Sequence, residues 1–361
     1  VISGVPLNPP AVPAALPVTL PVTSPVKVPT KPPAVANPLI LTPPAPVIPY
    51  PTVTSTPLSN CGAVPVLLLM VSIIVFILGV YGPGDPIEVQ LGNNYDEANA
   101  ERIREKMGLN DPVIVQWMRY IGNAVTGDFG ESYVFKNRDV SELLIPKLIV
   151  SAKLNIISFI IAISIGTPLG FYAAVNYGSS KDPIVVIISL VFYAMPVFFT
   201  APLLILVFAL QLDLVPAAGW GGVFDKRIIL PALTIGVPGA AVFVRLIRSS
   251  MLEVLDSDYI KLARAKGVSE INVLWKHAFR NAMLPVVTIM GFSLAGLFGG
   301  SLIVEILYGI PGVGRISLDS VYSRDYPVIM AIVLLGSSAL VIANLIIDFV
   351  YTLIDPRIDM Q

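Results

Sequence analysis

The sequence predicts an all-α integral membrane protein with six transmembrane helices, and three observations support this class. The chain of 361 residues is 55% hydrophobic and only 13% charged, and its mean hydropathy of +0.79 is far above that of a soluble domain. Nearly charge-free runs of about 20 residues, the length that crosses a hydrocarbon core of about 30 Å, occur six times. Too little amphipathic sequence remains to cover six buried helices in a soluble protein.

The six apolar runs are Val64–Tyr81, Leu154–Val175, Ile184–Leu212, Ile228–Val244, Ala282–Val304 and Pro327–Ile347. The fourth run is the shortest and contains Pro231 and Pro238, so its ends are the least defined. The third run is long and contains Pro196 and Pro202. We expect it to be a single span that is kinked or tilted, and not two separate helices.

Residues 1–63 are expected to form a Pro-rich, low-complexity tail outside the membrane fold of residues 64–361. The first sixty residues hold 17 of the 33 prolines, two lysines and no acidic residue. Such a composition favours extended polyproline II and cannot bury a compact core. It also lacks the basic start and apolar stretch of a signal peptide. The tail is either a lineage-specific linker or a segment foreign to the membrane fold, and the sequence leaves both open.

Composition and motif content exclude several functions. The net charge of −1 and the absence of a dominant basic patch indicate no nucleic-acid partner. With Cys61 as the lone cysteine and His277 as the lone histidine, neither an intrachain disulfide nor a cysteine- or histidine-based metal site is expected. The chain has no GxxxxGK[ST] motif, so any ATP that drives it is bound by another subunit. We therefore expect no catalytic residue and no enzymatic activity in this chain.

A charged segment, residues 251–283, lies between the fourth and fifth apolar runs and is predicted to contain a helix. Its apolar residues recur at spacings of three and four, as one helical stripe: Leu252, Leu255, Tyr259, Leu262 and Ala263. Asp256 or Ser257 can cap a helix that runs through Lys266, and Gly267 can end it. Such a helix, with cations near its end, fits a hydrophobic groove on a soluble partner, and it also fits lipid headgroups.

Residues 259–288, reading YIKLARAKGVSEINVLWKHAFRNAMLPVVT, closely resemble the coupling loop of ATP-binding-cassette importer permeases. The long gap between Gly267 and Leu284-Pro285 is typical of the peptide- and nickel-type importers, and the chain resembles their B-type permease. Further matches follow in register: Pro83-Gly84-Asp85-Pro86, residues 108–112 (GLNDP), residues 127–132 (GDFGES), residues 304–330 and residues 344–358. The resemblance covers the chain from about Val64 to its end.

The resemblance implies a complex in which this chain transmits motion. Its partners would be a second homologous permease, two ATPase subunits that bind ATP and Mg, an external substrate-binding protein and the lipid bilayer. The residues expected to contact the ATPase are Leu255, Tyr259, Lys261, Leu262, Ala263, Arg264, Ala265, Lys266 and Gly267. An external scoop over residues 82–147 would contact the binding protein through Asp111, Pro112, Gly127, Asp128, Gly130 and Ser132.

The substrate implied by the resemblance is a peptide, with nickel complexes or oligosaccharides as alternatives in the same family. An ion-coupled secondary transporter is the alternative from another class, and it would need midplane carboxylates or discontinuous helices around an ion site. A membrane anchor is a further alternative, but it would not need so elaborate a charged loop.

The distribution of basic residues predicts the orientation. Residues 245–280 hold seven Lys/Arg against four acids, and Lys181 and Arg357 raise the count on that side to nine. The opposing short loops hold four: Lys226, Arg227, Arg315 and Arg324. The coupling loop and both termini are therefore expected in the cytoplasm of a prokaryotic cell, with the chain crossing its plasma (inner) membrane several times.

Three polar residues near or within the last two runs are expected to lie in the helix bundle or along a transport pathway: Glu305, Asn344 and Asp348. A charge at the bilayer centre costs roughly 2.5–3.5 kcal/mol, so these side chains should face other helices or a boundary. The glycine-rich stretch Gly309–Arg315 looks like a phosphate cradle but follows an apolar run and contains a proline. We expect it to be a structural turn that leads into a helix over Ile316–Tyr322.

Overall fold

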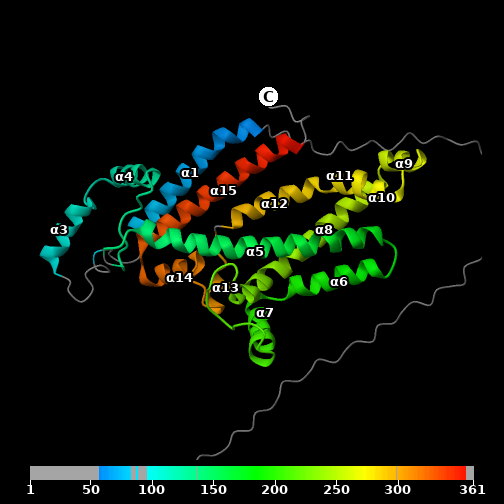
Figure 1. Ribbon diagram of the computed structural model, residues 1–361. Helices are drawn as coiled ribbons and strands as arrows, with labels where there is room; N and C mark the ends of the chain where they lie inside the picture. The colour runs from blue at the N-terminus through cyan, green and yellow to red at the C-terminus, as the bar shows by residue number, and fades with distance from the viewer. Residues whose placement is uncertain (1–56, 83–86, 88–95, 136, 298, 355–361) are drawn as a thin grey trace, which may run out of the picture. The chain divides into compact units, whose positions relative to one another are not determined.

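The computed structural model describes residues 57–82, 87, 96–135, 137–297 and 299–354 (Figure 1). Among these residues the regular structure is helical, apart from one isolated bridge between Glu131 and Asp139. The predicted all-α class is confirmed. The predicted tail, residues 1–63, lies outside the described residues except for its end, because α1 begins at Pro57.

The longer helices that follow the apolar runs are α1 (Pro57–Val80), α5 (Val140–Val175), α6 (Lys181–Ala194), α8 (Ile229–Asp256), α12 (Leu284–Gly296) and α15 (Tyr326–Ile354). The connecting elements are α3 (Glu97–Met107), α4 (Val113–Val125), α7 (Val197–Leu204), η2 (Ile205–Gln211), η3 (Lys226–Ile228), α9 (Asp258–Ala265), α10 (Glu270–Asn272), η4 (Val273–Phe279), α11 (Arg280–Ala282), α13 (Leu302–Leu307) and α14 (Val313–Ser323).

Glycines let α5 and α8 pack backbone to backbone. A side chain at Gly166 or Gly170 of α5 would lie 2.7 or 2.8 Å from a carbonyl oxygen of α8. A side chain at Gly236 of α8 would lie 2.8 Å from the carbonyl oxygen of Ser158. Small residues at helix contacts are how membrane helices gain close packing without a hydrophobic driving force between them.

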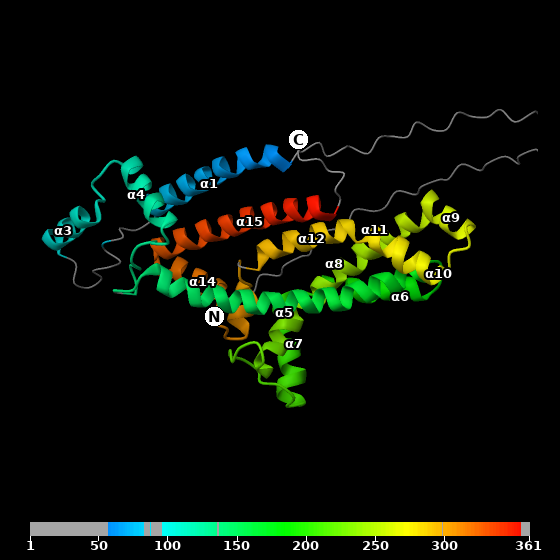
Figure 2. The ribbon, with the colours of Figure 1, turned by 45° about the horizontal axis from the view of Figure 1, so that its top comes forward.

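Helix α5 joins two distinct ends of the fold, as Figures 1 and 2 show. Near its first turn, Val140 and Leu144 pack with Ile316 of α14 and Val328 of α15. Near its last turn, Ala174 belongs to the core cluster of the charged segment. Thirty-six residues of helix separate the two ends by about 54 Å. We call residues 251–283 the coupling segment, and α13, the following turn and α14 the cap.

Three described helices, over residues 140–175, 226–256 and 326–346, are each long and apolar enough to cross a membrane. The bent pair α6 and α7–η2 raises the number to four if it forms one span. The shorter helices α1 and α12 follow two of the remaining predicted runs. The count of six spans therefore stays a prediction.

The expectation that Ile184–Leu212 forms one kinked helix, and not two separate helices, is wrong, whereas its crossing of the membrane as one span stays a prediction. Helix α6 ends at Ala194 and the chain turns by 97° before continuing from Val197. Met195 has an extended backbone, with φ −72° and ψ 119°. The residue before a proline is biased away from the helical region, so Pro196 forces the break and not a kink.

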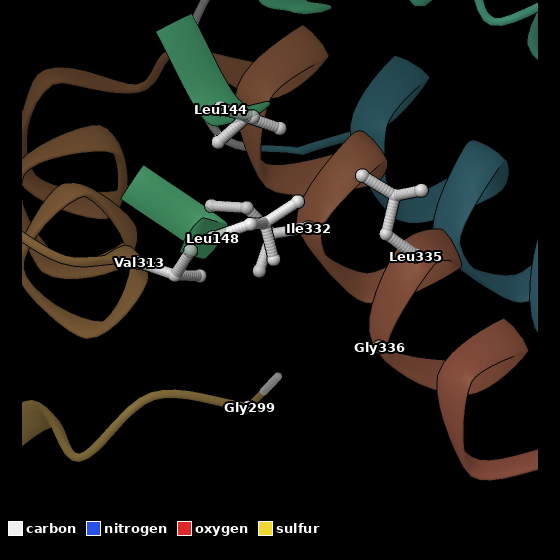
Figure 3. A pocket seen from close by; sticks show the side chains of 7 residues that line it. All are labelled: Leu144, Leu148, Gly299, Val313, Ile332, Leu335 and Gly336. Carbon is white, nitrogen blue, oxygen red and sulfur yellow. The ribbon is translucent and has the colours of Figure 1, made fainter. Parts of the chain in front are cut away.

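The fifth apolar run is also broken, where Ala282–Val304 was predicted as one span. Helix α12 ends at Gly296, and α13 begins only at Leu302. Gly300 in the break has φ +70°, a conformation that side chains with a Cβ disfavour. A small apolar pocket of about 30 Å³ lies beside Gly299, where Leu144 and Leu148 of α5 face Ile332 of α15 (Figure 3).

Candidate functional site

The coupling segment consists of the last turns of α8, the short helix α9 and the continuous run α10–η4–α11, so the predicted stripe is divided between two helices. Helix α8 ends at Asp256, Ser257 is extended with ψ 151°, and α9 begins at Asp258. Ser257 occupies the cap position, but its hydroxyl donates back to the carbonyl of Val254 (2.5 Å). Leu252 and Leu255 therefore belong to α8, whereas the remaining stripe residues lie on α9.

Ile260 anchors α9, and the spacing argument missed it. Its side chain is fully buried in one cluster with Met251 of α8 and Val273 of η4. A second anchor is aromatic: the Trp275 ring stacks on Phe171 of α5 at a centroid distance of 4.6 Å, and Phe279 packs edge-on against both. The i, i+4 spacing of Trp275 and Phe279 was the signal available in the sequence for this contact.

Gly267 ends α9, as predicted. Its φ is +77°, and α9 has its last helical residue at Ala265. Across this turn the Arg264 guanidinium donates to the Glu270 carboxylate in a bidentate pair, at 3.1 and 2.7 Å. These hydrogen bonds lower the pKa of Glu270 and raise that of Arg264. The turn is thus fixed by a left-handed glycine and one exposed ion pair.

The predicted contact residues differ in exposure. Leu255 and Ala263 are half-buried and pack against the core cluster. The Leu262 side chain is 55% exposed, and Tyr259 is 42% exposed with its hydroxyl bonded to the Asn281 amide at 2.7 Å. The other predicted residues are exposed as well: Lys261, Arg264, Ala265, Lys266 and Gly267. The surface of α9 thus combines an exposed leucine with exposed cations.

A nearly buried ion pair connects the last turns of α8 to α6. The Arg248 guanidinium donates to both oxygens of Asp182, at 2.5 and 2.7 Å, and the Asp182 side chain is only 6% exposed. A bidentate pair of this kind fixes the relative orientation of the two side chains and also strengthens their interaction. A movement of α8 next to the coupling segment would therefore carry the start of α6 with it.

At the other end of α5, the cap is built around a fully buried carboxylate, Glu305. Its oxygens accept hydrogen bonds from the Ser151 hydroxyl at 2.6 Å, the Ser301 backbone N–H at 3.2 Å and the Arg315 backbone N–H at 3.0 Å. The Ser151 hydroxyl in turn accepts from the Val313 N–H at 2.8 Å. Glu305 thus holds the first turn of α14, where the helix dipole favours negative charge.

The glycine-rich stretch Gly309–Arg315 is the structural turn that was predicted, and α14 extends the predicted helix to Val313–Ser323. Gly312 and Gly314 lie against the Glu305 carboxylate, where a side chain would collide with it. The likeness to a phosphate cradle has a physical basis, because the stretch wraps an anion. That anion is a side chain of this chain.

A second buried carboxylate, Asp325, ties the loop before α5 to the start of α15. It accepts hydrogen bonds from the Ser132 hydroxyl and from the Tyr133 N–H (3.0 Å for the latter). Burial, and then the charge of Asp325, raise the pKa of Tyr133 to about 12. Ser132 is 2% exposed, so its side chain does not lie on the surface where a binding-protein contact was expected.

The other residues predicted to contact a binding protein flank α4 and lie at the surface. Asp111 pairs with Arg119 at 2.5 Å, and Pro112 directly precedes α4. Gly127 and Gly130 follow α4 and have φ values of +87° and +80°, with open space around each. Asp128 is exposed and accepts a hydrogen bond from the Gly130 N–H at 2.9 Å.

Of the two polar residues predicted on the last helix, the structure describes one side chain. Asn344 lies on α15 with its Oδ1 buried, and that oxygen has no hydrogen-bond partner among the described residues. The side chain of Asp348 lies outside the described residues. The structure therefore places Glu305 in the bundle, and bundle contact or pathway stays open for Asn344 and Asp348.

These features define a class: a helical integral membrane protein with a charged segment exposed at one end of its helices. The chain belongs to the binding-protein-dependent transport system inner membrane component family, whose model matches residues 166–360. The model of the family's N-terminal membrane component matches residues 59–137. Together with the peptide-transport relatives named below, these matches confirm the predicted membership in peptide-type importer permeases. The family implies an ATPase and a substrate-binding protein as partners.

Several named relatives are similar over nearly their whole length. The oligopeptide transport system permease AppB of Bacillus subtilis (strain 168) is 39% identical over 81% of this chain and 95% of its own. The glutathione transport system permease GsiC of Escherichia coli (strain K12) is 40% identical over 82% and 96%. A chain of the inward-facing methionine transporter MetNI aligns with a TM-score of 0.49 and 18% identity, over 59% of this chain and 97% of that one.

Proposed function

We propose that this chain is a peptide permease subunit that receives motion from ATPase subunits through its coupling segment. In the complete importer it pairs with a second homologous permease, two ATPase subunits that bind ATP and Mg, and an external substrate-binding protein. The complex lies in a prokaryotic plasma (inner) membrane, with the coupling segment and both termini in the cytoplasm. The chain performs no bond chemistry of its own.

The observation that carries this proposal is the form of α9. It is anchored from beneath by the buried Ile260 and ended by the left-handed Gly267, so its opposite face is held outward. That face presents the exposed Leu262, nearly opposite Ile260 around the helix, with the exposed cations Lys261 and Lys266 on either side of it. A short rigid helix with an apolar centre and a charged border fits a groove on a folded partner. Closure of two such partners would move α8, and with it α6 through Asp182 and Arg248.

The substrate class rests on the relatives, whose names specify oligopeptides and glutathione, a tripeptide. A test is uptake of a labelled peptide by vesicles that contain this chain with its co-encoded permease, ATPases and binding protein. We expect uptake that requires ATP inside the vesicle and the binding protein outside. Uptake that follows an ion gradient without ATP would contradict the mechanism, and ATP-driven uptake of a nickel complex in place of peptides would contradict the substrate class.

A further inference from the structure

Helix α4 has three separate faces, and one of them has no role in the function described above. The first face packs on α1: the Trp117 indole donates to the Ser72 hydroxyl at 3.2 Å, and the Tyr120 ring lies 5.8 Å from Phe76. Gln116, also on this face, donates to the backbone carbonyls of residues 109 and 111. This face fixes how α4 is rotated against the bundle.

The second face is a polar edge. It carries Arg119, which pairs with Asp111, and the exposed amide of Asn123. Both residues line an open cavity of about 590 Å³ together with Glu131 and Asn137. The polar edge therefore borders an open cavity that is partly lined by polar side chains.

The third face is apolar and exposed. It consists of Ile114, Val115, Met118 and Val125, which are 66%, 37%, 55% and 82% exposed. At 100° per residue these four positions fall within one sector of the helix, opposite the sector that packs on α1. Gly122 lies in the same sector, with open space around it. A contiguous exposed apolar face of this kind marks an interaction surface.

We propose that this third face of α4 lies in the boundary between lipid headgroups and acyl chains, in the leaflet at the cap end. Helix α4 meets α1 at Ser72 and Phe76, within the apolar run Val64–Tyr81, and α1 exposes an apolar stripe on its opposite side, with Met70, Ile74 and Leu78 at 58%, 55% and 65% exposure. An amphipathic helix beside a membrane helix, with one flank polar and the other aliphatic, has the composition of an interfacial helix. Trp117 and Tyr120 are also the residue types that gather at this depth.

In this position α4 would anchor the external region to the membrane surface. The residues expected to meet the binding protein, among them Asp111 and Asp128, lie before and after α4. A helix seated in the interface would hold both ends of this region at a fixed height above the membrane. The inference depends on membrane insertion of α1 and is independent of which substrate is carried.

The test uses the full-length chain with its importer subunits in phosphatidylcholine–phosphatidylglycerol vesicles. The native cysteine, Cys61, is replaced by serine, and single cysteines at Met118, Val125 or Asn123 carry an environment-sensitive fluorophore. Lipids with a nitroxide near the headgroup should quench the Met118→Cys and Val125→Cys labels at least about twofold more strongly than the Asn123→Cys label. Aqueous iodide should show the reverse order, without any binding protein present.

Three outcomes would overturn the proposal. Equal iodide quenching at all three positions would place the face in water. Shielding of the Met118 and Val125 labels from iodide without quenching by lipid nitroxides would show that another subunit covers the face. Shielding that develops only after the external binding protein is added would assign the face to that protein.

Discussion

The two ends of α5 hold their charged groups in different ways. At the cap end, Glu305 and Asp325 are fully buried and accept hydrogen bonds from serine hydroxyls and backbone N–H groups. At the coupling end, Asp182 and Arg248 form a nearly buried pair outside the coupling segment, but within the segment Arg264 and Glu270 pair while each remains about half exposed. Removing a buried carboxylate is costly because the donors that it leaves behind cannot form hydrogen bonds to water instead. Exposed ion pairs, in contrast, contribute little to the free energy of unfolding. The cap is therefore the fixed end, and the coupling segment is the end whose contacts can change.

The largest expected effect is the loss of the Glu305 carboxylate. Glu305→Leu leaves the Ser151 hydroxyl and the N–H groups of Ser301 and Arg315 without their acceptor. Each buried unsatisfied donor costs about 1–3 kcal/mol, so we expect a loss of about 3 kcal/mol or more. The measurement is the amount of chain in membranes and the thermal unfolding midpoint of the purified protein.

Asp319 provides the matched control for the cap. It is an exposed carboxylate on α14, the other helix of the cap, so Asp319→Leu should leave the unfolding midpoint nearly unchanged. Glu305→Gln, which keeps the shape but replaces one acceptor oxygen by a donor, should fall between the two. Equal midpoints for Glu305→Leu and Asp319→Leu would remove the distinction between a fixed and an adjustable end.

The next effect is functional and lies at the coupling end. Gly267 is exposed and has open space around it, so a substitution there meets no steric clash. Its φ of +77° is the obstacle, which costs a residue with a Cβ roughly 1–2 kcal/mol. We expect Gly267→Val to reach the membrane at normal levels but to lose most substrate-stimulated ATP hydrolysis and transport. ATPase and uptake rates in proteoliposomes measure this.

Gly267→Asn distinguishes the effect of the backbone conformation from the effect of adding a side chain, because asparagine adopts the left-handed conformation more readily than valine. It should retain much more transport than Gly267→Val. If both variants transport at the unsubstituted rate, the backbone of this turn has no part in coupling. If Gly267→Val hydrolyses ATP normally and fails only in transport, the turn transmits motion without affecting docking.

The smallest effect is expected for the exposed ion pair. Glu270→Gln should destabilise the coupling segment by no more than about 0.5–1 kcal/mol, since exposed pairs rarely contribute more. Because Arg264 lowers the pKa of Glu270, the pair's contribution is present above the ordinary value of 4.5 and is lost as the pH falls below it. Proteolytic nicking of residues 251–283 between pH 4 and pH 8 would reveal this; a sharp change between pH 6 and 8 would contradict it.

Sequence reasoning succeeded where a local signal determines the structure. The long apolar helices α5, α8 and α15, the α14 helix and the glycine stop at Gly267 all follow from composition or from a single residue type. It did not predict the breaks between α6 and α7 and between α12 and α13. Within an apolar run, periodicity cannot show where the chain bends, and the consequence of Pro196 or Gly300 depends on what packs around the turn.

Contacts between residues far apart in the sequence could not be predicted either. Glu305 and Ser151 are separated by 154 positions, and the pairing of Ser132 with Asp325 spans 193. Neither pair has a local pattern that links its members. The burial of Ile260 was not predicted either. The apolar spacing placed Leu252, Leu255, Tyr259 and Leu262 on one stripe that does not include Ile260, whereas α9 begins only after Ser257.

The central claim, that α9 docks on an ATPase subunit, is tested most directly by site-specific cross-linking. A photoreactive group on a single cysteine at Leu262, in the Cys61→Ser background, should form an adduct with the ATPase subunit in the assembled importer. The same group at Phe224, which is fully exposed in the loop between η2 and η3, is the matched control and should not. An ATPase adduct from Phe224 and none from Leu262 would contradict the assignment of the coupling segment.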